Sequence, residues 1–172
     1  MIPETIKLLE NLVGIEPSLE EFIEQIYSSY QLTDCIITAG NGGSASTASH
    51  FTGDMLRRGE FSICISDNIA ATTALSNDIA FPVYMSCIFS AIKQKATLLL
   101  FSVSGESENL LKLATVARLN GVPIFSILGR SGSSLELLST ASFITDHKDY
   151  GIVESVHLLL AHSIADRIRS VK

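Results

Sequence analysis

Five short apolar segments recur along this chain, and their lack of alternation constrains the fold more than any other feature. They span residues 35–40, 61–66, 97–103, 123–128 and 142–146. A strand with one face in water alternates apolar and polar residues, whereas these segments are apolar almost throughout, which is typical of strands covered on both faces. The pattern therefore predicts the strands of a buried parallel sheet.

Helical segments are predicted between and after these strands. They span residues 45–57, 80–94, 107–119, 133–139 and 150–170. Alternating strands and helices indicate an α/β fold with right-handed crossovers, a doubly wound five-stranded parallel sheet. Before the first strand, apolar spacing predicts two amphipathic helices that divide near Gly14 and Pro17. We predict one domain over residues 1–172, with a helical pair (1–31) before an α/β core (32–172).

Composition excludes several classes of protein. A chain of 172 residues suits one domain with a full core and is short for two. The net charge of −6, without a basic run, argues against binding to nucleic acid or to an anionic membrane. The acidic, amphipathic N-terminal segment is unlike a signal peptide, and no apolar run is long enough to span a membrane, so we expect a cytoplasmic protein. Cys35, Cys64 and Cys87 lie in apolar runs, which favours reduced core thiols over a redox or metal role.

Two loops have the chemistry of a phosphate site. "GNGGS", Gly40–Ser44, and "SVSGES", Ser102–Ser107, each join a predicted strand to a predicted helix. Glycines let backbone N–H groups approach an anion, and a helix N-terminus adds positive potential. Neither loop has the Gly-Lys-Ser/Thr or GxGxxG pattern of nucleotide sites, so a small phosphomonoester is the better prediction. A tight turn with a helix cap is the alternative for each loop.

His50 and Asp54 are four residues apart, so they share one face of the helix that the first loop opens. An exposed ion pair is the simpler interpretation. At ~1.5 Å per residue, ~15 Å separates Ser44 from Asp54 along the helix axis. One small sugar phosphate spans that distance only if the helix lies along the ligand or a neighbouring subunit contributes, and both alternatives remain open.

The last predicted helix carries Glu154, His157 and His162 in an otherwise aliphatic segment. His157 is interpreted as a core histidine. Glu154 and His162 are ~12 Å apart along a helix axis, so they share one ion only if both lean inward or two chains contribute. Nitrogen and oxygen ligands suit zinc or a similar divalent ion, and the candidate set is His50, Asp54, Glu154 and His162.

Four segments together resemble the sugar isomerase (SIS) domain: "GNGGSASTASHF", "LSNDIAF", "SVSGESENLLKLATVARLNGVPIFSILG" and "DYGIVESVHLLLAHSIAD". Within that family they are most similar to the phosphoheptose isomerases, also called sedoheptulose 7-phosphate isomerases. The similarity covers nearly the whole chain, in the order and spacing of the family. It implies a flavodoxin-like sheet and a homo-oligomer, usually a tetramer, with active sites between subunits.

The resemblance also implies a role for each matching position. The substrate-binding positions correspond to Asn41, Gly42, Gly43, Ser44, Asn77, Asp78 and Glu154. The phosphate-binding loop corresponds to Ser102, Val103, Ser104 and Ser107. The zinc ligands correspond to His50, Asp54, Glu154 and His162. Among these, Asp54 and His162 match the catalytic residues.

Five positions depart from the pattern of the family. Asp54 replaces a Glu and is one methylene shorter, and Glu154 replaces a Gln and adds a negative charge. Val103 replaces a Thr. Glu106 replaces an Asn, and it would repel a phosphate unless its side chain points outward. Gly151 replaces an Asp that contacts the sugar. These changes leave the catalytic residues in place and bear on the identity of the sugar.

The leading hypothesis is isomerisation of sedoheptulose 7-phosphate to D-glycero-D-manno-heptose 7-phosphate through an enediol. Asp54 and His162 would transfer the protons, and zinc would stabilise the enediolate oxygens. One alternative is an isomerase of another phosphosugar in glycan biosynthesis. The other is a non-catalytic SIS protein that binds a phosphosugar or a replication-initiator partner, although the acid at position 54 favours an enzyme.

Overall fold

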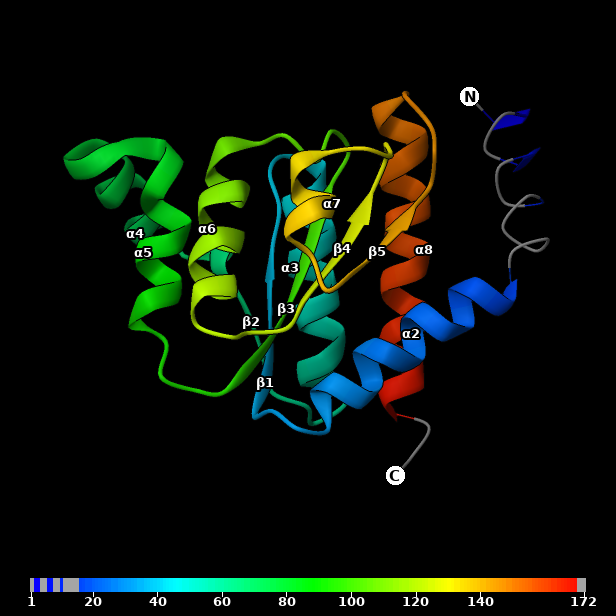
Figure 1. Ribbon diagram of the computed structural model, residues 1–172, viewed down its shortest axis with the longest axis horizontal. Coiled ribbons are helices and arrows are strands. Elements are labelled where there is room, and N and C mark those ends of the chain that lie inside the picture. Colours follow the sequence, from blue (N-terminus) through cyan, green and yellow to red (C-terminus); the bar gives the residue numbers. More distant parts are fainter. Residues whose placement is uncertain (1, 4–5, 8–9, 11–15, 170–172) are drawn as a thin grey trace.

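The computed structural model describes residues 2–3, 6–7, 10 and 16–169 of the chain (Figure 1). The second helix of the predicted N-terminal pair is α2, Glu16–Tyr30. Much of the first predicted helix lies outside the described residues. The Tyr30 hydroxyl at the end of α2 donates a buried hydrogen bond of 2.6 Å to Glu60, which ties this helix to the start of the second strand.

Five parallel strands form one sheet in the order β2-β1-β3-β4-β5, so the predicted α/β fold with a doubly wound parallel sheet is confirmed. The strands are β1 Cys35–Ala39, β2 Ser62–Cys64, β3 Ala96–Ser102, β4 Ile124–Leu128 and β5 Ala141–Ile144. Every residue of β1, β3 and β4 is buried, as their continuous apolar sequences require. This order is that of flavodoxin-like folds, whose ligands bind where the chain reverses direction between β1 and β3.

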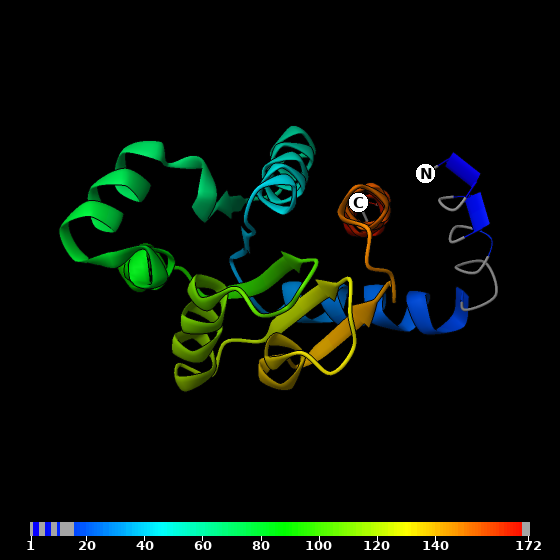
Figure 2. The same cartoon turned by 90° about the horizontal axis from the view of Figure 1, so that it is seen from above.

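Helices cover both faces of the sheet (Figure 2). On one face lie α3, Gly43–Arg57, and α8, Tyr150–Arg169. On the other lie α6, Glu108–Leu119, and α7, Ser134–Leu138, with α5, Tyr84–Ala91, packed beside α6. The side chain of Ile36 joins the core under α3 and α8, and that of Ile37 joins the core under α5 and α6. Alternate residues of each strand therefore serve different cores, which explains why the strands do not alternate in polarity.

A helical arm, residues 69–83, connects the edge strand β2 to α5. It consists of α4, Ile69–Leu75, a π-helical turn, Ser76–Ala80, and a 3₁₀ turn, Phe81–Val83, and none of its residues is buried. In both views α4 lies at the end of the molecule away from α8 (Figures 1 and 2). The helix predicted over 80–94 is confirmed in the shorter α5, whereas the helical structure that begins at Ile69 was not predicted. The segment "IAATTAL" lacks the spacing of large apolar residues that indicates a core-facing helix.

The three cysteines are free thiols, and Cys35 and Cys64 are buried in the sheet. Burial raises the pKa of Cys35 to about 11, so it stays protonated at neutral pH and is not a nucleophile. Among the described residues, no helix combines the length and apolar character needed to cross a bilayer.

Candidate active site

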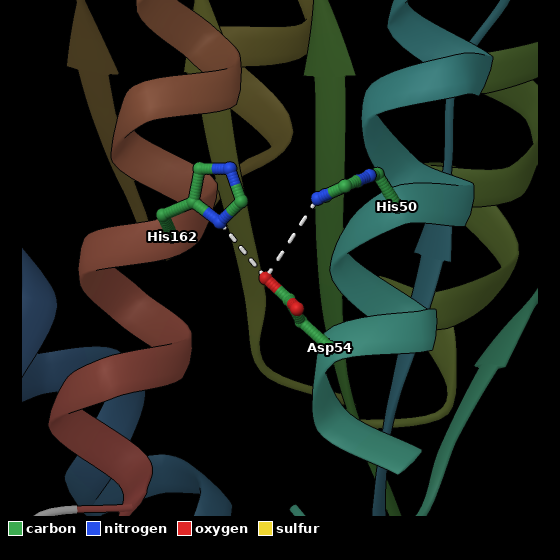
Figure 3. A group of neighbouring side chains, drawn as sticks. All are labelled: His50, Asp54 and His162. Carbon is green, nitrogen blue, oxygen red and sulfur yellow. Dashed lines mark hydrogen bonds and ion pairs between the residues drawn. The ribbon is translucent and has the colours of Figure 1, made fainter. Parts of the chain in front are cut away.

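Two histidines and a carboxylate meet between α3 and α8 (Figure 3). His50 and Asp54 lie one turn apart on α3, and His162 points toward them from α8. Oδ2 of Asp54 is 2.8 Å from Nδ1 of His162 and 3.9 Å from Nε2 of His50. The two rings meet edge to face with centroids 4.9 Å apart. Packing of α3 against α8 thus joins residues that are 108 positions apart in the sequence.

Two arginines hold the other oxygen of Asp54, and the sequence analysis did not single them out. Nη2 of Arg57 is 3.2 Å from Oδ1, and Nη1 of Arg58 is 3.4 Å from it. Arg58 is nearly buried and also pairs with Asp166 of α8. Their contact with Asp54 could have been predicted from the sequence, because residues three and four positions apart are neighbours on a helix.

The environment of Asp54 keeps it ionised. Burial acts to raise the pKa of this carboxyl, but hydrogen bonds to His162 and Arg57 and the charge of Arg58 act against burial, and the pKa lies below its usual value. Its side chain is only 12% exposed, whereas the side chains of His50 and His162 are 51% and 43% exposed. The cluster is therefore an anchored carboxylate with two accessible imidazoles.

The cluster has the donors of a divalent metal site. One ligand atom from each of His50, Asp54 and His162 lies within 4.8 Å of the others. Two imidazole nitrogens and one carboxylate oxygen, open to solvent on one side, match the three protein ligands and open position of catalytic zinc sites. Glu154, the fourth predicted ligand, is not part of this group.

Glu154 instead lies beside the first loop. A methyl group added to Gly43 would overlap the Glu154 carboxylate, so a larger residue at position 43 requires this side chain to move. A cavity of about 370 Å³ opens at this point. Its lining comprises Gly43, Ser46, Thr47, His50, Gly151, Glu154, Ser155 and Leu158. This cavity follows α3 from the glycine loop to His50.

A pair of asparagines connects the two predicted substrate loops. The side-chain amide of Asn41 donates to Asn109 at 2.9 Å, and that of Asn109 donates back to Asn41 at 2.8 Å. Asn109, at the start of α6, is 2% exposed. These bonds join the loop after β1 to the start of α6, directly after the second loop, across the switch point of the sheet. Sequence reasoning missed Asn109, since one asparagine early in a predicted helix has no distinctive pattern.

The second loop is folded on itself through its serines. Oγ of Ser102 accepts a hydrogen bond from the Gly105 N–H at 3.0 Å, and Oγ of Ser104 accepts one from the Glu106 N–H at 3.2 Å. Gly105 has a φ of 68°, which strongly favours glycine. Val103 is buried, so its side chain packs in the core.

The carboxylate of Glu106 is turned toward α7. Its Oε1 accepts a hydrogen bond of 2.7 Å from the backbone N–H of Ser134, in the first turn of that helix. This bond lowers the pKa of Glu106. The repulsion of a phosphate that this acid would cause is therefore reduced by its orientation.

Asn77 and Asp78 are the predicted substrate residues that the structure leaves apart. Both are exposed on the helical arm, where the Asn77 amide donates to Asp78 at 3.0 Å. The arm follows β2, at the edge of the sheet, while α8 lies at the other end of the molecule (Figure 1). Within one subunit these residues do not join His162.

Fold and site together define the class of protein. The sequence model of the SIS domain matches residues 4–129, and the chain belongs to the SIS domain family, as the sequence predicted. A phosphoheptose isomerase of Helicobacter pylori (strain Shi470) is 30% identical to it over 176 aligned residues, with 94% of this chain and 92% of the relative covered.

Solved structures agree on the fold. The phosphoheptose isomerase GmhA from Neisseria gonorrhoeae superposes with a TM-score of 0.88 at 24% identity, covering 98% of this chain and 95% of the other. A phosphoheptose isomerase from Francisella tularensis gives a TM-score of 0.89 at 22% identity, with 99% and 95% covered. At these identities the likeness establishes the flavodoxin-like SIS fold.

Proposed function

We propose that this chain is a phosphosugar isomerase that converts sedoheptulose 7-phosphate to D-glycero-D-manno-heptose 7-phosphate. The observation that carries the proposal is the contact between Asp54 and His162, 2.8 Å apart, beside a cavity that begins at the glycine loop. Full-length similarity to a phosphoheptose isomerase supports the same reaction.

In this proposal the two loops hold the substrate. The loop from Ser102 to Ser107 binds the phosphate through backbone N–H groups and hydroxyls, and the loop from Asn41 to Ser44 binds the sugar chain. The asparagine pair fixes the distance between the loops. Binding energy from the remote phosphate then positions the reacting carbons at the cluster.

Asp54 and His162 transfer the protons. The contact between Nδ1 and Asp54 fixes the His162 ring and leaves Nε2 to exchange a proton with the substrate. A metal held by the cluster would then be bound on the Nδ1 side of this ring. A base removes the proton next to the carbonyl, an enediolate forms, and a proton returns to the adjacent carbon. Arg57 and Arg58 keep the carboxylate in position for this role.

His50, Asp54 and His162 would hold a zinc ion, with Glu154 as the predicted fourth ligand. When bound, zinc would act as a Lewis acid toward the oxygens of the enediolate. Protein purified without chelators should contain close to one zinc per subunit, and the His50→Ala variant should contain far less. Full activity in metal-free protein would remove the ion from the proposal.

We further propose a cytoplasmic homotetramer of one SIS domain per chain, with sites completed between subunits. The support is the helical arm, which carries Asn77 and Asp78 away from the cluster of its own subunit. The arm also exposes Ile69, Ile79 and Phe81, by 74%, 59% and 53%. Apolar side chains exposed to this extent suit contact with another chain. Light scattering that shows an active monomer would contradict this assembly.

Another phosphosugar is the second candidate substrate. Gly151 and Glu154 both line the cavity, where the resemblance leads one to expect an Asp and a Gln. The cavity therefore has no side chain at residue 151 and a carboxylate, that of Glu154, one turn later. Both differences change the groups that would contact the hydroxyls of the sugar. A turnover assay against a panel of ketose and aldose phosphates tests both candidates. Binding without turnover across the panel would favour a non-catalytic role.

A further inference from the structure

A second cavity opens at the carboxyl ends of β4 and β5. Its volume is about 490 Å³. The lining comprises Gly129, Arg130, Ser131, Asp146, His147 and Lys148, none of which has a role in the site above. Ligands of doubly wound folds bind along this edge of the sheet. The cavity therefore lies at a suitable edge but outside the sugar site.

The lining is positively charged in an acidic chain. Arg130 comes from the loop after β4 and Lys148 from the loop after β5, and one acid, Asp146, opposes their two charges. The whole chain has a net charge of −6. A local excess of cations contributed by two separate loops favours an anion at this place.

Neutral hydrogen-bond donors complete the lining. Nδ1 of His147 accepts a hydrogen bond of 3.1 Å from the Asp149 N–H. The other ring nitrogen, Nε2, then carries the proton and can donate it to a ligand. The hydroxyl of Ser131 adds a second neutral donor. Guanidinium, ammonium, imidazole N–H and hydroxyl groups together match the oxygens of a phosphate.

Gly129 separates this cavity from the candidate phosphate loop. Its N–H donates to the Ser102 carbonyl at 3.1 Å, and its own carbonyl accepts from the His147 N–H at 2.9 Å. A Cβ atom at residue 129 would lie 2.6 Å from the Val103 carbonyl oxygen. The backbone of Gly129 therefore lies between this cavity and the start of the phosphate loop, and it is bonded to both sides.

We propose that this cavity is a second anion site, which binds a phosphate-bearing small molecule while the loop at 102–107 holds the phosphate of the sugar. Two cations suit the charge of a phosphomonoester, about −1.5 to −2 at neutral pH. The inference rests on the proposed function only for the assignment of the loop to the sugar.

Inorganic phosphate is the probe. The unfolding midpoint is followed against phosphate concentration, at an ionic strength held constant with chloride, because a bound ligand raises this midpoint. The variant R130A/K148A removes the two cations, and S104A/S107A weakens the loop. K93A/K112A removes the same charge from two exposed lysines outside the cavity and is the matched control.

We expect R130A/K148A to weaken one component of phosphate binding by about tenfold or more, because hydrogen bonds to charged groups are the stronger ones. S104A/S107A should retain that component, K93A/K112A should behave as wild type, and saturating sugar phosphate should leave the component in place.

Three results would overturn the proposal. R130A/K148A could respond as wild type or as K93A/K112A does. S104A/S107A could abolish the whole response. Sugar phosphate could displace the component that depends on Arg130 and Lys148, which would mean that the cavity holds the phosphate of the sugar. None of these readouts requires turnover, so the turnover panel tests the proposed function independently.

Discussion

The α3–α8 pair and the helical arm both carry predicted site residues, but only the first assembles them within one subunit. Between α3 and α8, Asp54 contacts His162 at 2.8 Å and two arginines within 3.4 Å. On the arm, Asn77 and Asp78 bond to each other and face solvent.

The difference follows from burial. Residues of α3 and α8 such as Phe51 and Ile164 are less than 2% exposed and join one core, so the sheet fixes the positions of both helices. The arm has no buried residue, and its partly buried Leu75 packs against the core under α5 and α6, so it is held less firmly than α3 and α8. This difference is the basis of the proposal that a second copy of the chain completes the site.

The largest effect is expected at the preassembled cluster. Asp54→Asn and His162→Ala should each lower kcat on the order of 100- to 10,000-fold, the usual range for loss of a proton-transfer group. Binding of the sugar phosphate, measured by calorimetry, should persist because the loops are unchanged. Glu20→Gln, an exposed acid on α2, is the control and should keep wild-type kcat. Full activity in either cluster variant would remove the mechanism.

Subunit mixing tests the arm directly. Asn77→Ala combined with Asp78→Asn should lower activity by about tenfold or more, because charge-assisted hydrogen bonds to substrate contribute roughly 1.5–3 kcal/mol each. If the site is shared, mixing this weakened protein with Asp54→Asn subunits should give more activity than the sum of the two separate proteins, because some interfaces then combine two intact halves. Mixtures without such a gain after confirmed subunit exchange would show that each subunit works alone.

Sequence patterns predicted the parts of this molecule that depend on local or periodic signals. The strands were found because residues such as Leu98, Leu99 and Leu100 are buried on both faces of the sheet, which leaves a continuous apolar run. His157 was correctly interpreted as a core histidine, since it stands among aliphatic residues and is 0% exposed.

Contacts that depend on tertiary packing had no such signal. The chemistry of their side chains placed Asp54 and His162 in one candidate metal set only weakly, because helical spacing does not relate residues on two different helices, and the resemblance supplied the stronger argument. Arg58 and Asn109 were missed, since their roles depend on which residues of other elements they meet. The arm was missed because exposure removes the apolar periodicity that would mark its helix.

Glycine substitutions compare the crowded start of α3 with an open position on the same helix. Gly43→Ala should displace the Glu154 carboxylate, distort the cavity and raise KM several-fold. Gly53→Ala meets no atom within 4 Å and should be neutral or more stable by up to about 1 kcal/mol, because alanine is the better helix former. Steady-state kinetics and urea unfolding measure the two effects. Equal KM values for the two variants would show that close contact at Gly43 does not shape the site.

The smallest effect on turnover is expected at His157, which is buried on α8 five residues before His162. Its ring lies 6.4 Å from that of Phe101, and burial lowers its pKa to about 4, against a weaker opposing effect of the Leu128 carbonyl. The native state therefore holds this imidazole neutral, while the unfolded chain takes up a proton below its ordinary value of 6.5. Stability should fall as the pH drops from 6.5 toward 4, by roughly 2 kcal/mol at pH 5.

His157→Leu should remove the part of the acid-induced loss of stability that comes from this imidazole. Its kcat at pH 7 should stay close to that of the wild type. The free energy of unfolding in urea, compared at pH 7 and pH 5 at one protein concentration, measures the effect. His147→Gln, outside this core, should keep the wild-type difference between the two pH values. If His157→Leu also kept that difference, burial of this imidazole would not link the stability of α8 to pH.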